Sequence, residues 1–95
     1  MNMPHVLITG GLGFIGMECC NQFLQHGWTV QILDIKTPTL SQKKWIEGND
    51  VLFIQGDIRV DDDVKRALTG CSAVVNLAAQ VLSLIHISEP TRHAS

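Results

Sequence analysis

Two patterns of hydrophobic and polar positions alternate along the chain. Short, nearly continuous apolar runs rich in β-branched residues are followed by segments in which apolar residues recur every three or four positions. The first pattern is typical of strands in a parallel sheet, and the second is typical of amphipathic helices. The predicted strands cover residues 5–9, 28–35, 51–56 and 72–79, and the predicted helices cover residues 13–26, 40–48 and 61–70.

Single residues mark the faces and ends of the predicted helices. Met17, Cys20 and Leu24 share one face of the first helix, as expected for residues that pack on a sheet. Ser41 is a candidate N-cap of the second helix. The acidic run 61–63 opens the third helix, where we expect it to cap the N-terminus and to favour the helix dipole.

The alternation of strands and helices predicts the fold class. Consecutive strands joined through helices pair in parallel, with right-handed crossovers. The sequence therefore predicts an α/β fold with a doubly wound parallel sheet, of which it contains the first four strands and their helices. We assign residues 1–81 to this N-terminal part of a domain.

Composition and charge narrow the class of protein. A chain of 95 residues with 45% hydrophobic and 17% charged residues is typical of one small globular domain. The net charge of −2 gives no electrostatic basis for binding nucleic acid or an anionic membrane surface. Three cysteines without C-x-x-C spacing, and a start that lacks the features of a signal peptide, predict reduced thiols and a cytoplasmic protein.

The stretch ITGGLGFIG, residues 8–16, contains the candidate chemistry. Gly10, Gly13 and Gly16 follow the first strand and open the first helix. Gly10 would form the tight turn, Gly13 would let a pyrophosphate approach the backbone, and Gly16 would let the helix pack against the sheet. Free N–H groups at the start of the helix would hold the anion.

Asp34 completes the pattern at the end of the second predicted strand. A carboxylate about 20 residues beyond such glycines accepts both hydroxyls of an adenosine ribose, so the combination predicts a Rossmann-like dinucleotide-binding domain. The alternative is that the glycines only build a turn and that Asp34 is a solvated strand end. The agreement of strand, turn, helix and acid in position favours the binding site.

The charge of Asp34 also predicts the cofactor. Its carboxylate would repel the 2′-phosphate of NADP, and no arginine follows the glycine turn to compensate. Lys36 lies two residues further on, and its positive charge weakens this argument against NADP. NAD is preferred over NADP.

Three stretches resemble one known family. TGGLGFIG, residues 9–16, is similar to the signature of the extended short-chain dehydrogenases/reductases, in the NAD-dependent epimerase/dehydratase group. GDIR at residues 56–59 and NLAAQV at residues 76–81 match later segments of that family in order and spacing, with Asn76 in place of a more frequent histidine. The resemblance implies backbone amides over the pyrophosphate at Phe14 and Ile15, adenine contacts at Asp57 and Ile58, and a backbone beneath the nicotinamide ribose at Leu77, Ala78 and Ala79.

The resemblance also implies the activity of a longer parent protein. Family members use a Tyr-x-x-x-Lys pair beyond the fourth strand as the acid/base group, and this chain contains no tyrosine. We therefore assign no catalytic residue and expect the 95-residue chain to be inactive. The parent would be a homodimeric epimerase or dehydratase of a nucleotide sugar that works by transient hydride transfer. The alternative is a non-catalytic sensor of NAD(P) with the same fold.

The last residues depart from this pattern. LSLIHISEPTR, residues 82–92, is identical to the translation of a transposase adapter that is used to build sequencing libraries. We therefore expect residues 82–95 to be a non-native tail that starts where the gene was cut. The alternative is a natural C-terminus with a chance identity.

Sequencing of the genomic locus tests this expectation. We expect a reading frame that continues past Val81 with different residues and encodes a Tyr-x-x-x-Lys pair further on. A genomic stop codon directly after Ser95 would contradict it.

Overall fold

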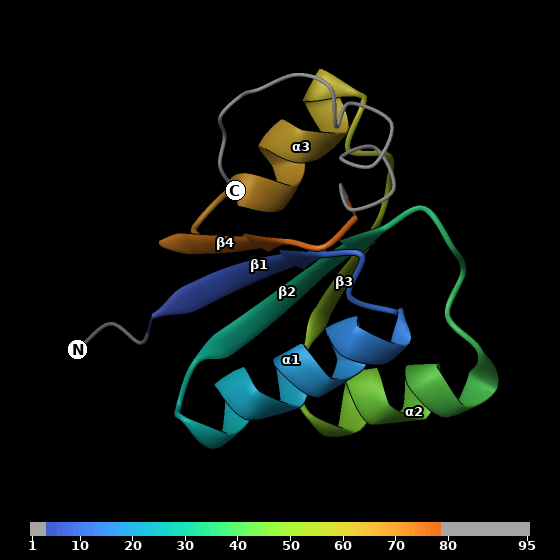
Figure 1. The fold of residues 1–95 in the computed structure, drawn as a ribbon, viewed down its shortest axis with the longest axis vertical. Coiled ribbons are helices and arrows are strands. Elements are labelled where there is room, and N and C mark those ends of the chain that lie inside the picture. Colours follow the sequence, from blue (N-terminus) through green and yellow to red (C-terminus); the bar gives the residue numbers. More distant parts are fainter. Residues whose placement is uncertain (1–3, 79–95) are drawn as a thin grey trace, which may run out of the picture.

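The computed structural model describes residues 4–78, so Ala79 and the proposed non-native tail lie outside the described residues. Strands and helices alternate strictly in this part of the chain, as Figure 1 shows. The elements are β1 (His5–Thr9), α1 (Phe14–Gln25), β2 (Thr29–Asp34), α2 (Leu40–Gly48), β3 (Leu52–Gln55), α3 (Asp61–Leu68) and β4 (Ala73–Asn76).

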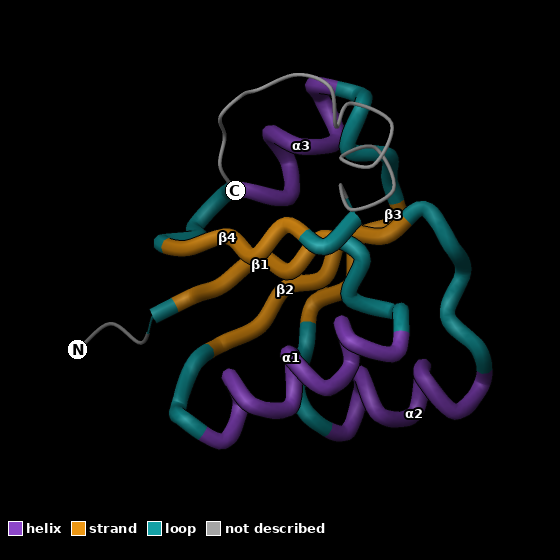
Figure 2. Tube along the Cα trace, in the orientation of Figure 1, coloured by secondary structure: helices purple, strands orange, loops and turns teal. Residues whose placement is uncertain are grey.

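The strands form one parallel sheet in the order β3-β2-β1-β4. Helices α1 and α2 cover one face, and α3 covers the other (Figures 1 and 2). This arrangement confirms the predicted α/β doubly wound fold. The chain moves from β1 through β2 to β3 and then returns to the other side of β1, so a topological switch point lies between β1 and β4. Ligands of open α/β sheets bind at the carboxyl ends of strands at such a point.

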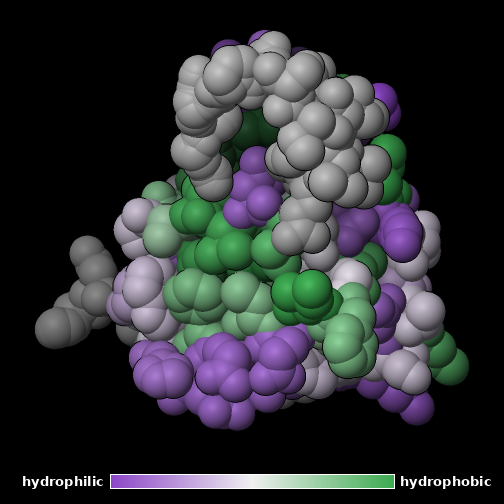
Figure 3. All heavy atoms as spheres, in the orientation of Figure 1, coloured by the Kyte–Doolittle hydropathy of each residue, from purple (hydrophilic) through white to green (hydrophobic). Residues whose placement is uncertain are grey.

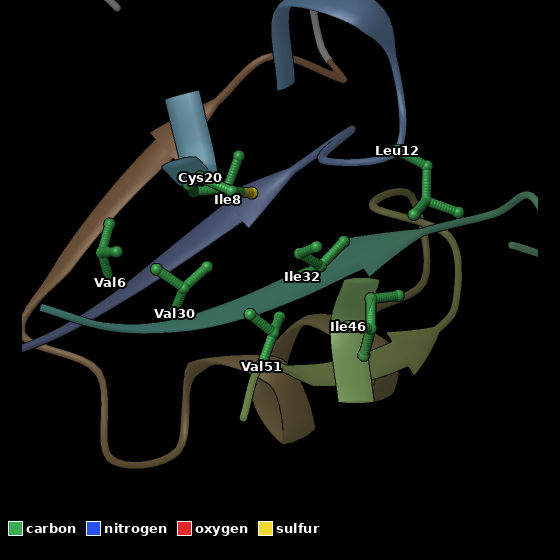
Figure 4. Packing of buried hydrophobic residues seen from close by; sticks show 8 residues of the cluster. All are labelled: Val6, Ile8, Leu12, Cys20, Val30, Ile32, Ile46 and Val51. Atoms are coloured by element: carbon green, nitrogen blue, oxygen red, sulfur yellow. The ribbon is translucent and has the colours of Figure 1, made fainter. Parts of the chain in front are cut away.

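The core explains why β1 and β2 read as continuous apolar runs. Successive side chains of a strand point to opposite faces, and both faces of these two strands are covered. The face under α1 and α2 contains the larger cluster, drawn in Figure 4. Its buried members are Val6, Ile8, Leu12, Cys20, Val30, Ile32, Ile46 and Val51.

The hydrophobic cluster on the opposite face is smaller, and it lies next to one buried polar contact. Leu7 and Leu33 pack there against Ala67 of α3. Gln31, also buried, donates a hydrogen bond from Nε2 to the Ala67 carbonyl at 2.9 Å. A buried amide without a partner would destabilise the fold by about 1–3 kcal/mol, so this bond accounts for the polar residue within an apolar strand.

The start of α2 differs from the prediction. Thr39, not Ser41, is the N-cap, and its side chain accepts a hydrogen bond from the Gln42 N–H at 3.2 Å. Gln42 accepts one from the Thr39 N–H in return, at 2.9 Å. This reciprocal capping box satisfies two backbone donors, whereas Ser41 already lies within the helix.

The outer strands are less covered than the inner ones. Side chains of β4 alternate between partly buried and exposed, and Val74 is 49% exposed. In β3 the two middle side chains are partly buried and the two end ones are exposed. Figure 3 shows hydrophobic atoms across the face where β4 forms the edge of the sheet. Between residues 4 and 78 no helix has the length and hydrophobicity needed to cross a membrane.

Candidate functional site

The glycine turn after β1 lies against the end of β4. Gly10 has a φ of +73°, in the left-handed region that glycine adopts without strain. Its N–H donates to the Leu33 carbonyl of β2 at 2.8 Å. A Cβ added to Gly10 would lie 2.8 Å from the Ala78 nitrogen. Both the backbone angle and this close approach therefore require glycine.

Gly16 allows the start of α1 to pack closely against the glycine turn. An added Cβ would overlap the Gly10 carbonyl oxygen and lie 2.7 Å from the Gly11 Cα atom. The sequence interpretation placed this contact on the sheet, but the structure places it on the turn itself. Gly11 was not predicted as a site residue, although a Cβ there would lie 2.8 Å from Ile32 Cγ2.

Gly13 differs from these glycines because the fold does not require it. Its φ is −73°, and the nearest atom to an added Cβ is the Gly10 carbonyl oxygen at an ordinary 3.5 Å. Gly13 is the N-cap of α1 and forms no side-chain cap, and the next residues, Phe14 and Ile15, are 93% and 61% exposed. The first N–H groups of a helix have no partner within it, so those of residues 14–16 are available to an anion.

The Asp34 carboxylate lies beside the turn, on the same side of the sheet. Its Oδ2 accepts a hydrogen bond from the Leu12 N–H at 3.0 Å, and its Oδ1 accepts one from the Lys36 N–H at 3.0 Å. The residue is only 8% exposed. A carboxylate has about four acceptor positions, so each oxygen keeps capacity for one hydroxyl of a ligand.

Gln42 holds the other side of the same turn. Its Nε2 donates to the Leu12 carbonyl at 2.9 Å, while Asp34 accepts the Leu12 N–H. The peptide groups on both sides of Leu12 are therefore fixed, one by the end of β2 and one by the start of α2. The sequence analysis missed this residue, although the T-x-x-Q spacing at residues 39–42 is a signal for the capping box.

Thr9 connects the turn to the end of β4. Its carbonyl accepts hydrogen bonds from the N–H groups of Leu77 and Ala78, each at 3.1 Å, and its buried hydroxyl donates to Asn76 Oδ1. The segment that resembles the nicotinamide-ribose platform therefore lies next to the glycine turn. Thr9 was not predicted, and Ala79 lies outside the described residues.

A hollow of about 370 Å³ opens at the carboxyl ends of β2 and β3. It brings Asp34 together with three other predicted residues, Asp57, Ile58 and Ala78. The complete lining is Leu33, Asp34, Ile35, Gly56, Asp57, Ile58, Arg59 and Ala78. The binding roles of these residues stay predictions, but the fold places them around one space.

Asp57 forms a close ion pair with Arg59 at this hollow. Arg59 Nη2 lies 2.8 Å from Asp57 Oδ2, and Arg59 Nε lies 3.0 Å from Oδ1. The hydrogen bonds from the Arg59 side chain, followed by that from its backbone N–H, lower the pKa of Asp57 from 3.8 to about 2. Asp57 is therefore a charged acceptor at neutral pH.

Asp63 supports this segment from the first turn of α3. Its Oδ2 accepts a hydrogen bond from the Asp57 N–H at 2.9 Å. Gly56 allows the approach, because an added Cβ would lie 2.9 Å from Asp63 Cγ. The three acids do occupy the first turn, but the expected capping is wrong, since the N-cap is Val60 and no side chain caps it.

Three comparisons show similar proteins. The model of the 3-beta hydroxysteroid dehydrogenase/isomerase family matches residues 7–91. A cis-2,3-dihydrobiphenyl-2,3-diol dehydrogenase of Paraburkholderia xenovorans is 37% identical over 68 residues, which cover 72% of this chain and 24% of the relative. A UDP-glucose 4-epimerase of Neisseria meningitidis serogroup A is 32% identical over 97 residues, which cover 96% of this chain and 29% of the relative.

The fold of this chain is similar to that of proteins of known structure. A dTDP-glucose 4,6-dehydratase from Bacillus anthracis, in complex with NAD, superposes with a TM-score of 0.69 at 26% identity. The superposition covers 83% of this chain and 28% of the dehydratase. The chain thus spans between 24% and 29% of the length of these proteins.

The packing of α1 on the turn gives a first prediction for a variant. In Gly16→Ala the new methyl group overlaps the turn, so we expect the free energy of unfolding to fall by about 1–3 kcal/mol, as in other overpacked sites. Urea unfolding followed by circular dichroism measures it. Gly13→Ala is the control and should lose no more than about 1 kcal/mol, since the methyl group fits there and the only cost is that alanine is a poorer N-cap than glycine. Equal stability of Gly16→Ala and wild type would refute the close packing.

The Asp57–Arg59 pair gives a prediction about pH. The pKa of Asp57 is lower in the folded chain than its ordinary 3.8, so the pair stabilises the fold above that value, and the contribution is lost as the pH falls through about 2. Carboxyl NMR should show this low pKa for Asp57 in the wild type. In Arg59→Gln the pKa should rise toward 3.8, and an unchanged pKa would show that the pair does not form.

Proposed function

The chain belongs to the 3-beta hydroxysteroid dehydrogenase/isomerase family, among the NAD-dependent epimerases and dehydratases, and on that premise we propose that it is the cofactor-binding part of such an enzyme. The parent protein would act on a nucleotide sugar by transient hydride transfer. The proposal gives this chain the task of holding the dinucleotide, and it assigns the catalytic acid/base group to residues beyond this chain.

One observation carries the proposal. The Asp34 carboxylate and the glycine turn form a single hydrogen-bonded unit, with the Leu12 N–H between them. The N–H groups at the uncapped start of α1 lie directly after that turn. A dinucleotide combines a vicinal diol with a pyrophosphate, and this unit offers acceptors for the first beside donors for the second.

The hollow would hold the adenosine end of such a ligand. Asp34 would accept the two ribose hydroxyls with the acceptor positions that the backbone leaves free. Asp57 and Ile58 would contact the base, since both line the same space. This placement is supported by geometry and by the resemblance of GDIR to the family segment.

The opposite end of the ligand would lie over the end of β4. The Thr9 carbonyl accepts the N–H groups of Leu77 and Ala78, so their backbone would support a nicotinamide ribose from beneath. When bound, NAD would take a hydride from a hydroxyl carbon of the substrate and return it later. The described residues of this chain would bind and orient the cofactor.

The surroundings of Asp34 favour NAD over NADP. A 2′-phosphate would meet a carboxylate that is held in place by two backbone N–H groups and is unable to turn away. Arg59 also lines the hollow, and a free cation there could attract a 2′-phosphate. Its guanidinium is bound to Asp57, so it is not free to compensate a phosphate.

The nucleotide-sugar substrate is proposed from the names of the relatives, a UDP-glucose 4-epimerase and a dTDP-glucose 4,6-dehydratase. The diol dehydrogenase among the relatives is named for a different substrate, a dihydrobiphenyl diol. A homodimeric, cytoplasmic parent is part of the same proposal and rests on the family resemblance and on cysteine usage.

Titration of the 95-residue chain with NAD tests the proposal. Nitrogen-15 NMR follows each backbone amide, and we expect the signals of residues 13–16 and 56–58 to shift, with NADP binding more weakly than NAD. Gly13→Ala should keep the dispersed spectrum of a folded chain but bind NAD roughly tenfold more weakly, because the methyl group occupies the path of the pyrophosphate.

Two results would contradict the proposal. In the first, a folded wild-type chain shows no shifts with NAD at millimolar concentration. In the second, Gly13→Ala binds NAD as well as the wild type, which would place the ligand away from the turn.

A further inference from the structure

The Asp57–Arg59 pair has more hydrogen bonds than an ordinary surface ion pair, although 69% of the Arg59 side chain is exposed. Exposed pairs are usually mobile and contribute little, because two long side chains must be fixed in one geometry. Here the Arg59 backbone N–H also donates to Asp57 Oδ1, at 2.9 Å, so the carboxylate belongs to a closed turn. The guanidinium then contacts both carboxylate oxygens.

The backbone of the turn is fixed at both ends. The Asp57 N–H donates to Asp63 Oδ2 at 2.9 Å, and the Asp57 carbonyl accepts from the Val60 N–H at 2.9 Å. The Gly56 N–H donates to the Asp34 carbonyl at 3.0 Å, which ties the segment to the end of β2. Rotation of the Asp57 side chain is then the main freedom left, and Arg59 restricts it.

A carboxylate held in this way accepts hydrogen bonds and donates none. Its pKa of about 2 keeps it charged at neutral pH, and it lines the hollow together with Asp34 and Ile58. Any group of a base that faces it must be a donor. Adenine has an amino group at position 6, whereas hypoxanthine and guanine have a carbonyl oxygen there, which a carboxylate repels.

We propose that Arg59 is a positioning residue for base recognition: it holds the Asp57 carboxylate in the orientation that selects 6-amino purine dinucleotides over 6-oxo purine dinucleotides. The inference rests on the proposed function, because it requires the adenosine end of a dinucleotide in this hollow. It adds a specificity determinant that neither the glycine turn nor Asp34 supplies, since those groups contact only phosphate and ribose.

The test compares NAD with nicotinamide hypoxanthine dinucleotide, in which a carbonyl oxygen replaces the amino group at position 6 of the base and N1 carries a hydrogen. The dissociation constant of each is measured by NMR titration of the 95-residue chain. We expect the wild type to prefer NAD by roughly tenfold, the selectivity of one hydrogen bond to a charged group. In Arg59→Gln the preference should fall to about twofold or less, mainly through weaker NAD binding.

Two further variants separate the positioning of the Asp57 carboxylate from the effect of a change in net charge. Asp57→Asn removes the charged acceptor and should abolish the preference as Arg59→Gln does. Lys65→Gln removes one positive charge from an exposed position of α3 and should keep the preference of the wild type. Dispersed amide spectra of all variants show that each one is folded.

The outcomes separate the inference from the function on which it rests. If the wild type binds NAD but Arg59→Gln keeps the full preference, or if the wild type binds both dinucleotides equally, the role of Arg59 is wrong and the dinucleotide site stands. If Lys65→Gln loses the preference as well, the effect is one of net charge and the inference is overturned. If the folded wild type binds neither ligand, the proposed function fails, and the inference fails with it.

Discussion

The hydrogen bond between the Leu12 N–H and the Asp34 carboxylate is the contact on which the site depends. It joins the turn after β1 to the end of β2, the strand next to it in the sheet. With the Leu12 carbonyl held by Gln42, the turn has a fixed position relative to the helix that follows. Close packing of Gly16 on the turn then directs the start of α1 toward the switch point of the sheet.

Acids organise the backbone on both sides of the hollow. Asp34 accepts the N–H of Leu12, and Asp63 accepts the N–H of Asp57, so each carboxylate fixes a segment that comes from another part of the chain. Hydrogen bonds to a charged acceptor are stronger than neutral ones, which suits short segments with little packing of their own. Asp57 and Ala78 both line the hollow. The Asp57 N–H is held by Asp63, and the Ala78 N–H is held by the Thr9 carbonyl.

Local patterns in the sequence predicted most of the fold and part of the site. The apolar runs, the glycine spacing and Asp34 are each recognisable within a few residues, and the structure confirms the parallel sheet and the alternation of strands and helices that the sequence predicts. Contacts between distant segments were missed, because no local pattern encodes them: Gln42 reaches Leu12 across 30 positions and Thr9 reaches Asn76 across 67. The wrong N-cap at Ser41 has a local cause, since Thr39 forms the better reciprocal pair with Gln42.

The central claim is that one dinucleotide spans the glycine turn, with its adenosine ribose on Asp34. A crystal structure of the 95-residue chain grown with NAD tests this most directly. The account predicts the ribose hydroxyls within hydrogen-bond distance of the Asp34 carboxylate and the pyrophosphate over the first N–H groups of α1. A structure in which NAD binds with its ribose away from Asp34, or in which the turn and Asp34 lie apart, would contradict it.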